Sequence, residues 1–102
     1  IMFKNGMRPI HPGEILKEEY LEPLGLTAAA LARALHVSAP TVNDIVLMRR
    51  SISADVALRL AAALETTAQF WLNLQTAYDL RTAEIAKGAQ ISKEVEKVAH
   101  CA

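Results

Sequence analysis

The chain has 102 residues, a length that supports one folded domain and excludes two independent ones. Hydrophobic residues make up 52% of the chain and charged residues 22%, so we expect a folded protein, with a radius of gyration of about 13 Å, and not a disordered or collagen-like one. Eleven basic and eleven acidic side chains give a formal net charge of zero. Contact with nucleic acid would therefore depend on a local basic patch and not on bulk charge.

The cysteine content of the chain and its lack of a signal-like segment predict a cytoplasmic protein. The single cysteine, Cys101, cannot form an intramolecular disulfide, and no charged segment followed by an apolar stretch resembles a secretory signal. The charge-free stretch of residues 66–78 around the aromatic side chains is too short to span a bilayer, so no membrane anchor is expected.

Apolar residues recur at three- and four-residue spacing and do not alternate over the length of a strand, which predicts an all-α fold. Residues 1–7 show no periodicity and are expected to be flexible. Pro12 and Gly13 open the first helix, and Pro23 and Gly25 end or kink it. The apolar row expected on this helix is Leu16, Tyr20 and Leu24.

Ser, Thr and Gly residues divide the rest of the chain into further helices. The expected caps are Thr27, Ser38, Ser53 and Thr67, for helices over residues 28–35, 39–47, 54–64 and 68–87. Their expected apolar faces include Leu31, Ala32 and Leu35 on one helix, and Val56, Leu58, Leu60, Ala61 and Leu64 on another. Gly88 is expected to end the main domain, 8–88, and a short helical tail, 89–102, is expected to contain a last helix over residues 92–100.

A connection of only three residues, 36–38, joins the second and third helices, which favours a steep crossing of the helix-turn-helix type. Ala32 is small where the helices would cross, Val37 would fill the turn, and Val42 and Ile45 would face inward. The third helix is then the candidate recognition helix, and the residues that face out of it are Ala39, Pro40, Thr41, Asn43 and Asp44. Thr41 and Asn43 have side chains that can read base edges.

These motifs resemble a known family. The run LARALHVSAPTVNDIV resembles the helix-turn-helix of the lambda-repressor/Cro-like (XRE) superfamily. The segments RPIHPGEIL, RRSISADVALRLAAAL and FWLNLQTAYDL are similar to the HigA-type antitoxins, also called virulence-associated protein I, over the range from Arg8 to about Leu80. HPGE and FWLNLQ are the specific part of this match. The chain departs from the family at His36, where Gly is usual, at Ala39-Pro40, and at Leu47-Met48, where Asn-Gly is common.

The resemblance implies a five-helix, lambda-repressor-like DNA-binding domain with a short C-terminal helical extension. It implies a cytoplasmic homodimer that binds an operator in its own promoter and neutralises a HigB-type toxin, a ribosome-dependent mRNA endonuclease. The residues expected at DNA are Thr27, Ser38, Ala39, Pro40, Thr41, Asn43, Asp44, Arg49 and Arg50.

Arg49 and Arg50 follow the recognition helix and are assigned to phosphates, the alternative being that they only solvate a loop. Thr27 could contact a phosphate at a helix N-terminus, or serve only as an N-cap. Asp44 could accept a hydrogen bond from cytosine or restrain Arg49, or be a solvated acid at the edge of the footprint.

Apolar side chains cover more of the fifth helix than one core-facing stripe requires, so part of it is expected to meet a second copy of the chain. The candidate dimerisation residues are Phe70, Trp71, Leu74 and Tyr78. Trp71 and Leu74 could instead serve only the core. A dimer would place two recognition helices about 34 Å apart, in successive major grooves.

No enzyme, cofactor or metal site is expected. The three histidines, His11, His36 and His100, lack metal-ligand spacing and are interpreted as surface residues. Glu14, Glu18 and Glu22 share a helix face, which is interpreted as a solvated acidic surface or as a contact for a basic toxin. Two alternatives remain: an orphan repressor without a toxin, and a protein-interaction module that no longer reads DNA.

Overall fold

The computed structural model describes residues 8–98; the segments 1–7 and 99–102, including the expected flexible N-terminus, His100 and Cys101, lie outside the described residues. The elements are α1 (Pro12–Leu16), a π-helical turn η1 (Lys17–Leu21), α2 (Glu22–Leu24), α3 (Ala28–Leu35), α4 (Ala39–Val46), α5 (Ala54–Leu64) and α6 (Ala68–Glu94). Since α1, η1 and α2 form one continuous helical segment, the described part of the chain is a five-helix, all-α fold, which confirms the predicted class.

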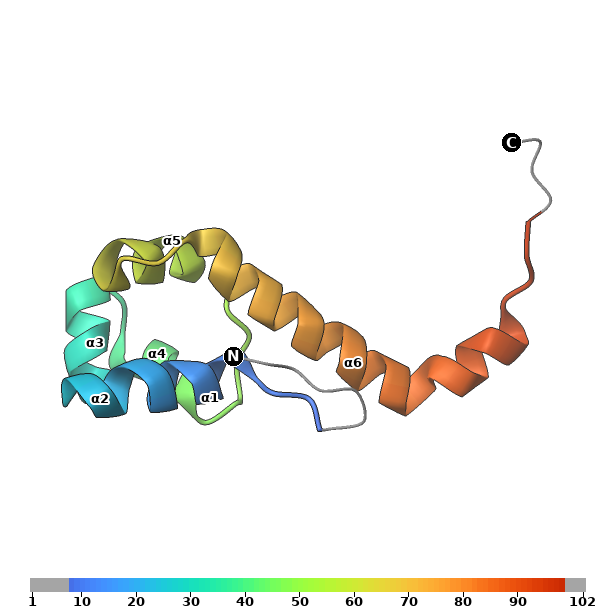
Figure 1. Cartoon of the computed structure of the whole chain (residues 1–102), viewed down its shortest axis with the longest axis horizontal. Helices are drawn as coiled ribbons and strands as arrows, with labels where there is room; N and C mark the ends of the chain where they lie inside the picture. The colour runs from blue at the N-terminus through green and yellow to red at the C-terminus, as the bar shows by residue number, and fades with distance from the viewer. Residues whose placement is uncertain (1–7, 99–102) are drawn as a thin grey trace.

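Figure 1 shows how the helices are arranged. The α1–η1–α2 segment forms one edge of the molecule, α5 lies along the other, and α3 closes the end between them. α4 packs against α3 and α1, while α6 packs against α5 and α1 before it extends away from the other helices. No helix within residues 8–98 is both long enough and apolar enough to cross a membrane.

The first helical segment begins where the sequence predicts but contains an irregular turn. The N–H of Glu22 donates to the carbonyl of Lys17, five residues earlier, and Pro23 one residue later has no N–H to continue the normal ladder. Gly25 then ends the segment in the left-handed conformation, with φ of 65°. The wider turn shifts the apolar face by one position, so Leu21 is buried and Leu24, expected in the apolar row, is exposed.

The core confirms most of the expected apolar positions. The buried hydrophobic residues are Ile15, Leu16, Leu21, Leu31, Ala32, Leu35, Val42, Ile45, Ile52, Val56, Ala57, Leu60, Trp71 and Leu74. On α5 the core position is taken by Ala57, while Leu58 is 64% exposed, so its expected place on the buried face was wrong. Trp71 is fully buried, and its indole N–H donates to Thr66 Oγ1 at 2.7 Å.

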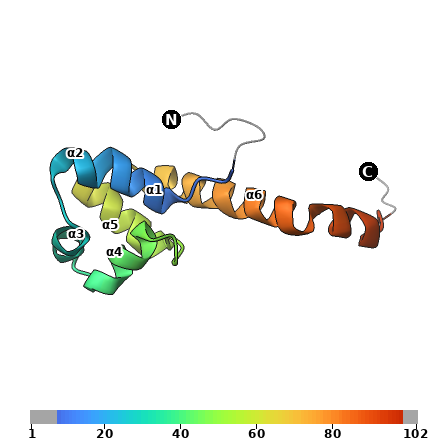
Figure 2. The same ribbon diagram turned by 90° about the horizontal axis from the view of Figure 1, so that it is seen from below.

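The last helix is longer than predicted. α6 starts after the N-cap Thr67, as expected, but it continues through Gly88 to Glu94, so the expected end at Gly88 and the separate helix over residues 92–100 were wrong. Gly88 does not adopt a positive φ, and good helix formers follow it without a proline. At 27 residues α6 is about 40 Å long. Its projecting half raises the radius of gyration to 16.7 Å, above the expected value (Figure 2).

Replacing Gly13 or Gly88 by alanine should change the stability of the fold in opposite directions. A Cβ at Gly13, where α1 crosses α4, would overlap the backbone carbonyl of Ile45, whereas a Cβ at Gly88 would meet nothing closer than 4.0 Å. Gly13→Ala should therefore lower the free energy of unfolding by about 1–3 kcal/mol. Gly88→Ala should raise it by about 0.5–1 kcal/mol. Urea denaturation measures both, and wild-type stability of Gly13→Ala would contradict the close helix crossing.

Candidate nucleic-acid interface

The connection between α3 and α4 has the geometry of a helix-turn-helix. His36 ends α3 in the left-handed conformation, with φ of 59° and ψ of 44°, in the position where a glycine would be least strained. The N–H of Val37 bonds back to the carbonyl of Ala32 at 3.0 Å, and Ser38 then begins α4 in an extended conformation. Val42 and Ile45 of α4 are buried, as the spacing predicts.

The outer face of α4 carries the predicted reading residues. Ala39, Pro40 and Asn43 are exposed, while Thr41 and Asp44 are partly buried. Ser38 Oγ lies 2.8 Å from Thr41 Oγ1, so the two hydroxyls share a hydrogen bond at the start of the helix. Thr27 caps α3, accepting from the N–H of Ala30 at 3.0 Å, and its hydroxyl therefore already has a structural role.

The segment after α4, residues 47–53, which we call the arginine loop, presents two exposed guanidinium groups. Asp44 lies 3.8 Å from Arg49 and 4.0 Å from Arg50, measured between carboxylate oxygen and guanidinium nitrogen. An ion pair between Asp44 and Arg49, which one of the alternatives for this acid requires, is therefore present. Met48 has a positive φ of 64°, a conformation that glycine adopts with less strain.

Two polar side chains that sequence reasoning missed support this surface. Gln75 is buried on α6, and its Oε1 accepts the Ile52 N–H at 2.8 Å, from within the arginine loop. Arg59 of α5 donates to the carbonyl of Leu35 at 2.8 Å, capping the C-terminal end of α3. Local patterns do not predict these two contacts, because in each the side chain bonds to main chain more than twenty positions away.

His11 was expected at the surface, but the structure buries it to 2% exposure. Its Nδ1 accepts the N–H of Gly13 at 2.9 Å, and Glu14 completes a capping box by accepting the His11 N–H at 3.1 Å. The spacing of His11 and Glu14 was the available signal for this cap. The imidazole also packs edge-on against Tyr78, with ring centroids 4.8 Å apart, so it joins the start of α1 to α6.

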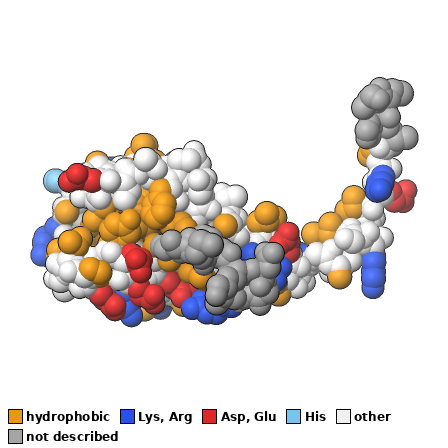
Figure 3. All heavy atoms as spheres, viewed as in Figure 1, with side chains coloured by type: hydrophobic (Ala, Val, Ile, Leu, Met, Phe, Trp, Pro, Cys, Tyr) orange, Lys and Arg blue, Asp and Glu red, His pale blue; other side chains and the backbone are white. Residues whose placement is uncertain are grey.

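Glu14 is likewise not part of a solvated acidic face. Arg8 binds its two carboxylate oxygens at 2.7 and 2.9 Å, and this bidentate pair is the largest cause that lowers the pKa of Glu14. Glu18, Glu19 and Glu22 are exposed, and Figure 3 shows acidic side chains along the edge formed by the first helical segment. Contact of this edge with a toxin stays a prediction.

The candidate dimerisation residues divide into two groups. Trp71 is fully buried and Leu74 is 5% exposed, so both side chains lie in the core of the single chain, the position that their core interpretation predicts. Phe70 and Tyr78 are only partly buried, so their role at a dimer contact stays a prediction.

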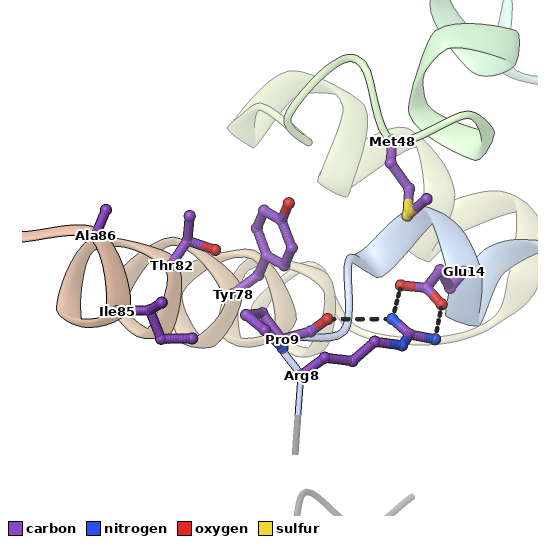
Figure 4. Close-up of a pocket in the computed structure, with 8 residues that line it drawn as sticks. All are labelled: Arg8, Pro9, Glu14, Met48, Tyr78, Thr82, Ile85 and Ala86. Atoms are coloured by element: carbon purple, nitrogen blue, oxygen red, sulfur yellow. Dashed lines mark hydrogen bonds and ion pairs between the residues drawn. The ribbon is translucent and has the colours of Figure 1, made fainter. Parts of the chain in front are cut away.

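A groove lies where α6 leaves the other helices (Figure 4). Its volume is about 420 Å³, and its walls are Arg8, Pro9, Glu14, Met48, Tyr78, Thr82, Ile85 and Ala86. Tyr78, Thr82, Ile85 and Ala86 come from α6, while Met48 comes from the arginine loop and the Arg8–Glu14 pair forms one end. Within residues 8–98 there is no cluster of three potential metal-binding side chains.

Comparison with known proteins defines the class to which this fold and surface belong. A family model described as helix-turn-helix matches residues 17–71. Virulence-associated protein I of Dichelobacter nodosus is 62% identical over 81 residues, which cover 79% of this chain and 75% of that protein.

Two further matches narrow the family. Antitoxin HigA-1 of Vibrio cholerae is 48% identical over 79 residues, covering 78% of this chain and 74% of that protein. The structure of the Pseudomonas aeruginosa antitoxin HigA with the higBA promoter is 59% identical, with a TM-score of 0.86 over 90% of this chain and all of that one. The chain therefore belongs to the helix-turn-helix proteins and, among them, to the HigA family of antitoxins.

The buried imidazole predicts a loss of stability in mild acid. Burial is the main cause that lowers the pKa of His11 from 6.5, and Glu14 and Asp79 only partly oppose it. The unfolded chain thus binds a proton more readily, so this stabilisation is complete above about pH 6.5 and is lost as the pH falls through the lowered folded value. Protonation would also remove the Nδ1 lone pair that accepts the Gly13 N–H.

Thermal melts at pH 7.5 and 5.0 test this, with His11→Asn as the matched variant, because asparagine retains an N-cap acceptor but does not titrate. The melting temperature of the wild type should fall further between pH 7.5 and pH 5.0 than that of His11→Asn. Glu14 titrates below its usual value of 4.5 and contributes little in this window. An equal loss in both proteins would contradict the role of the imidazole.

Proposed function

We propose that this protein is a dimeric antitoxin and repressor that binds the operator of its own promoter and neutralises a HigB-type mRNA endonuclease toxin. The observation that carries the proposal is the outward face of α4, with exposed Asn43 and partly exposed Thr41, followed by two exposed arginines in the arginine loop, on a chain of the HigA family. The protein acts in the cytoplasm as a binding protein and not as an enzyme. The orphan repressor, which has the same DNA surface, is the alternative that the toxin experiment below addresses.

The proposed roles follow the chemistry of each side chain. Thr41 and Asn43 read base edges in the major groove, and Ala39 and Pro40 allow close approach of the helix start to the DNA. Arg49 and Arg50 bind phosphates, and Ser38 and Thr27 lie at helix N-termini, where backbone N–H groups attract phosphate. Asp44 holds the two guanidinium groups near the helix before binding.

Dimerisation completes the interface. One α4 helix spans only one major groove, so an inverted repeat requires a second protomer whose α4 lies about 34 Å away. Support for a second copy comes from α6, whose residues from Asp79 to Lys87 are all exposed in the single chain. Phe70 and Tyr78, which lie on α6 before this exposed stretch, are the residues of the predicted contact that a partner can reach.

Removing one phosphate contact should change the salt dependence of DNA binding. For Arg50→Ala, the plot of log K against log salt should become shallower by about one or two units per dimer, because each protomer loses one contact. Lys17→Ala is the matched control, since Lys17 is an exposed cation on the first helical segment, outside α4, the arginine loop and α6. Fluorescence anisotropy with promoter DNA and unrelated DNA measures both; no salt-sensitive binding by the wild type at micromolar protein would exclude the DNA proposal.

Neutralisation of a toxin is tested in cells. The small reading frame adjacent to this gene should arrest growth when it is expressed alone, and co-expression of this protein from an independent promoter should restore growth. The independent promoter separates neutralisation from repression of the operon. Absence of arrest, or arrest without rescue, would leave an orphan repressor.

A further inference from the structure

Gln75 is an unusual residue for the buried face of α6. It is 6% exposed and lies beside Trp71 and Leu74, where an apolar side chain would need no hydrogen-bond partner. Both ends of its amide are used: Oε1 accepts the Ile52 N–H at 2.8 Å, and Nε2 donates to Asp79 Oδ1 at 2.9 Å. The bond to Asp79 fixes which end of the amide faces the loop.

The acceptor of this amide is aimed at the arginine loop. Ile52 lies two residues after Arg50, and its side chain is buried in the core at 3% exposure. At the other end of the loop, the Arg49 N–H bonds to the carbonyl of Asp44 at 2.7 Å, which attaches the chain to α4. The main chain that carries the two guanidinium groups is thus held at both sides, by α4 before it and by α6 after it.

A further contact comes from the start of α1. The backbone of Arg50 approaches the His11 imidazole closely enough to favour its protonated form, and His11 itself packs against Tyr78 of α6. His11, at the start of α1, and Gln75 on α6 therefore approach the arginine loop from two different helices.

We infer that Gln75 is a positioning residue for DNA binding: its side-chain amide fixes the main chain of the arginine loop so that Arg49 and Arg50 are presented to adjacent phosphates before DNA arrives. This inference rests on the proposed DNA-binding function. A loop ordered in advance loses less conformational freedom on binding, so the affinity for DNA is higher than with a loose loop. Gln75 itself does not contact the DNA.

The experiment measures operator binding by anisotropy across a salt series, with circular dichroism to confirm that each variant is folded at the assay temperature. Gln75→Met removes both hydrogen bonds at nearly constant volume. Gln75→Asn, a second variant, stays polar but withdraws the oxygen from Ile52. Gln69→Met is the control, because Gln69 is an exposed glutamine of α6 bonded only along its own helix, to Asn73 at 2.8 Å.

We expect Gln75→Met and Gln75→Asn to bind the operator about 3- to 10-fold more weakly, the range for loss of one hydrogen bond, and with a shallower salt dependence. When Gln75→Met is combined with Arg50→Ala, the fold-loss of operator affinity should be smaller than the product of the two single losses, because both changes act through the same phosphate contacts. The double variant Gln75→Glu/Asp79→Asn keeps an acceptor for Ile52 and reverses the bond to position 79. It should bind within about 2-fold of the wild type.

Three results would overturn the inference. The first is wild-type affinity and salt dependence in a folded Gln75→Met or Gln75→Asn variant. The second is a combined loss of operator affinity with Arg50→Ala that equals the product of the two single losses, and the third is no recovery of affinity in the double variant. Each would assign Gln75 to general stability alone. Failure of the proposed function is a separate result, because then neither the wild type nor Gln69→Met would bind the operator in a salt-dependent way.

Discussion

The crossing of α1 and α4 at Gly13 is the constraint on which the arrangement of the DNA surface depends. The backbone of α1 lies against the carbonyl of Ile45 so closely that no side chain fits between them. Ile45 belongs to the last turn of the candidate recognition helix, so this contact fixes the end of α4 from which the arginine loop departs. His11 and Glu14 stabilise the start of α1 by capping it, and the position of α4 therefore depends on residues outside the helix-turn-helix itself.

Local sequence signals predict the helices well because their causes are local. The caps Thr27, Ser53 and Thr67 each accept a backbone N–H in their own first turn, and the apolar spacing of α3 and α4 places Leu31, Val42 and Ile45 in the core. The tight connection at His36 indicates the steep crossing of these helices. Fold class and the outward face of α4 follow from these features alone.

The remaining features depend on contacts that local patterns do not contain. The π-helical turn before Pro23 shifts the apolar face by one residue, so Leu21 is buried and Leu24 is exposed, which regular helical periodicity cannot predict. Gly88 is typical of a helix C-terminus, yet it is tolerated within α6 because the residues after it favour a helix. The burial of His11 and Gln75 depends on tertiary partners, Tyr78 for one and Ile52 for the other, that are distant in the sequence.

A chain with no net charge can still bind DNA because its charges are separated in space. Exposed glutamates lie on the first helical segment, whereas Arg49 and Arg50 lie on the loop after α4. In the free protein Asp44 compensates the two arginines only at 3.8 and 4.0 Å, and exposed ion pairs of this kind contribute about 0–1 kcal/mol. A phosphate offers closer, charge-assisted hydrogen bonds, so it can replace Asp44 at small cost. The weak pairing to Asp44 thus keeps both arginines near their proposed binding positions while leaving them free to exchange partners.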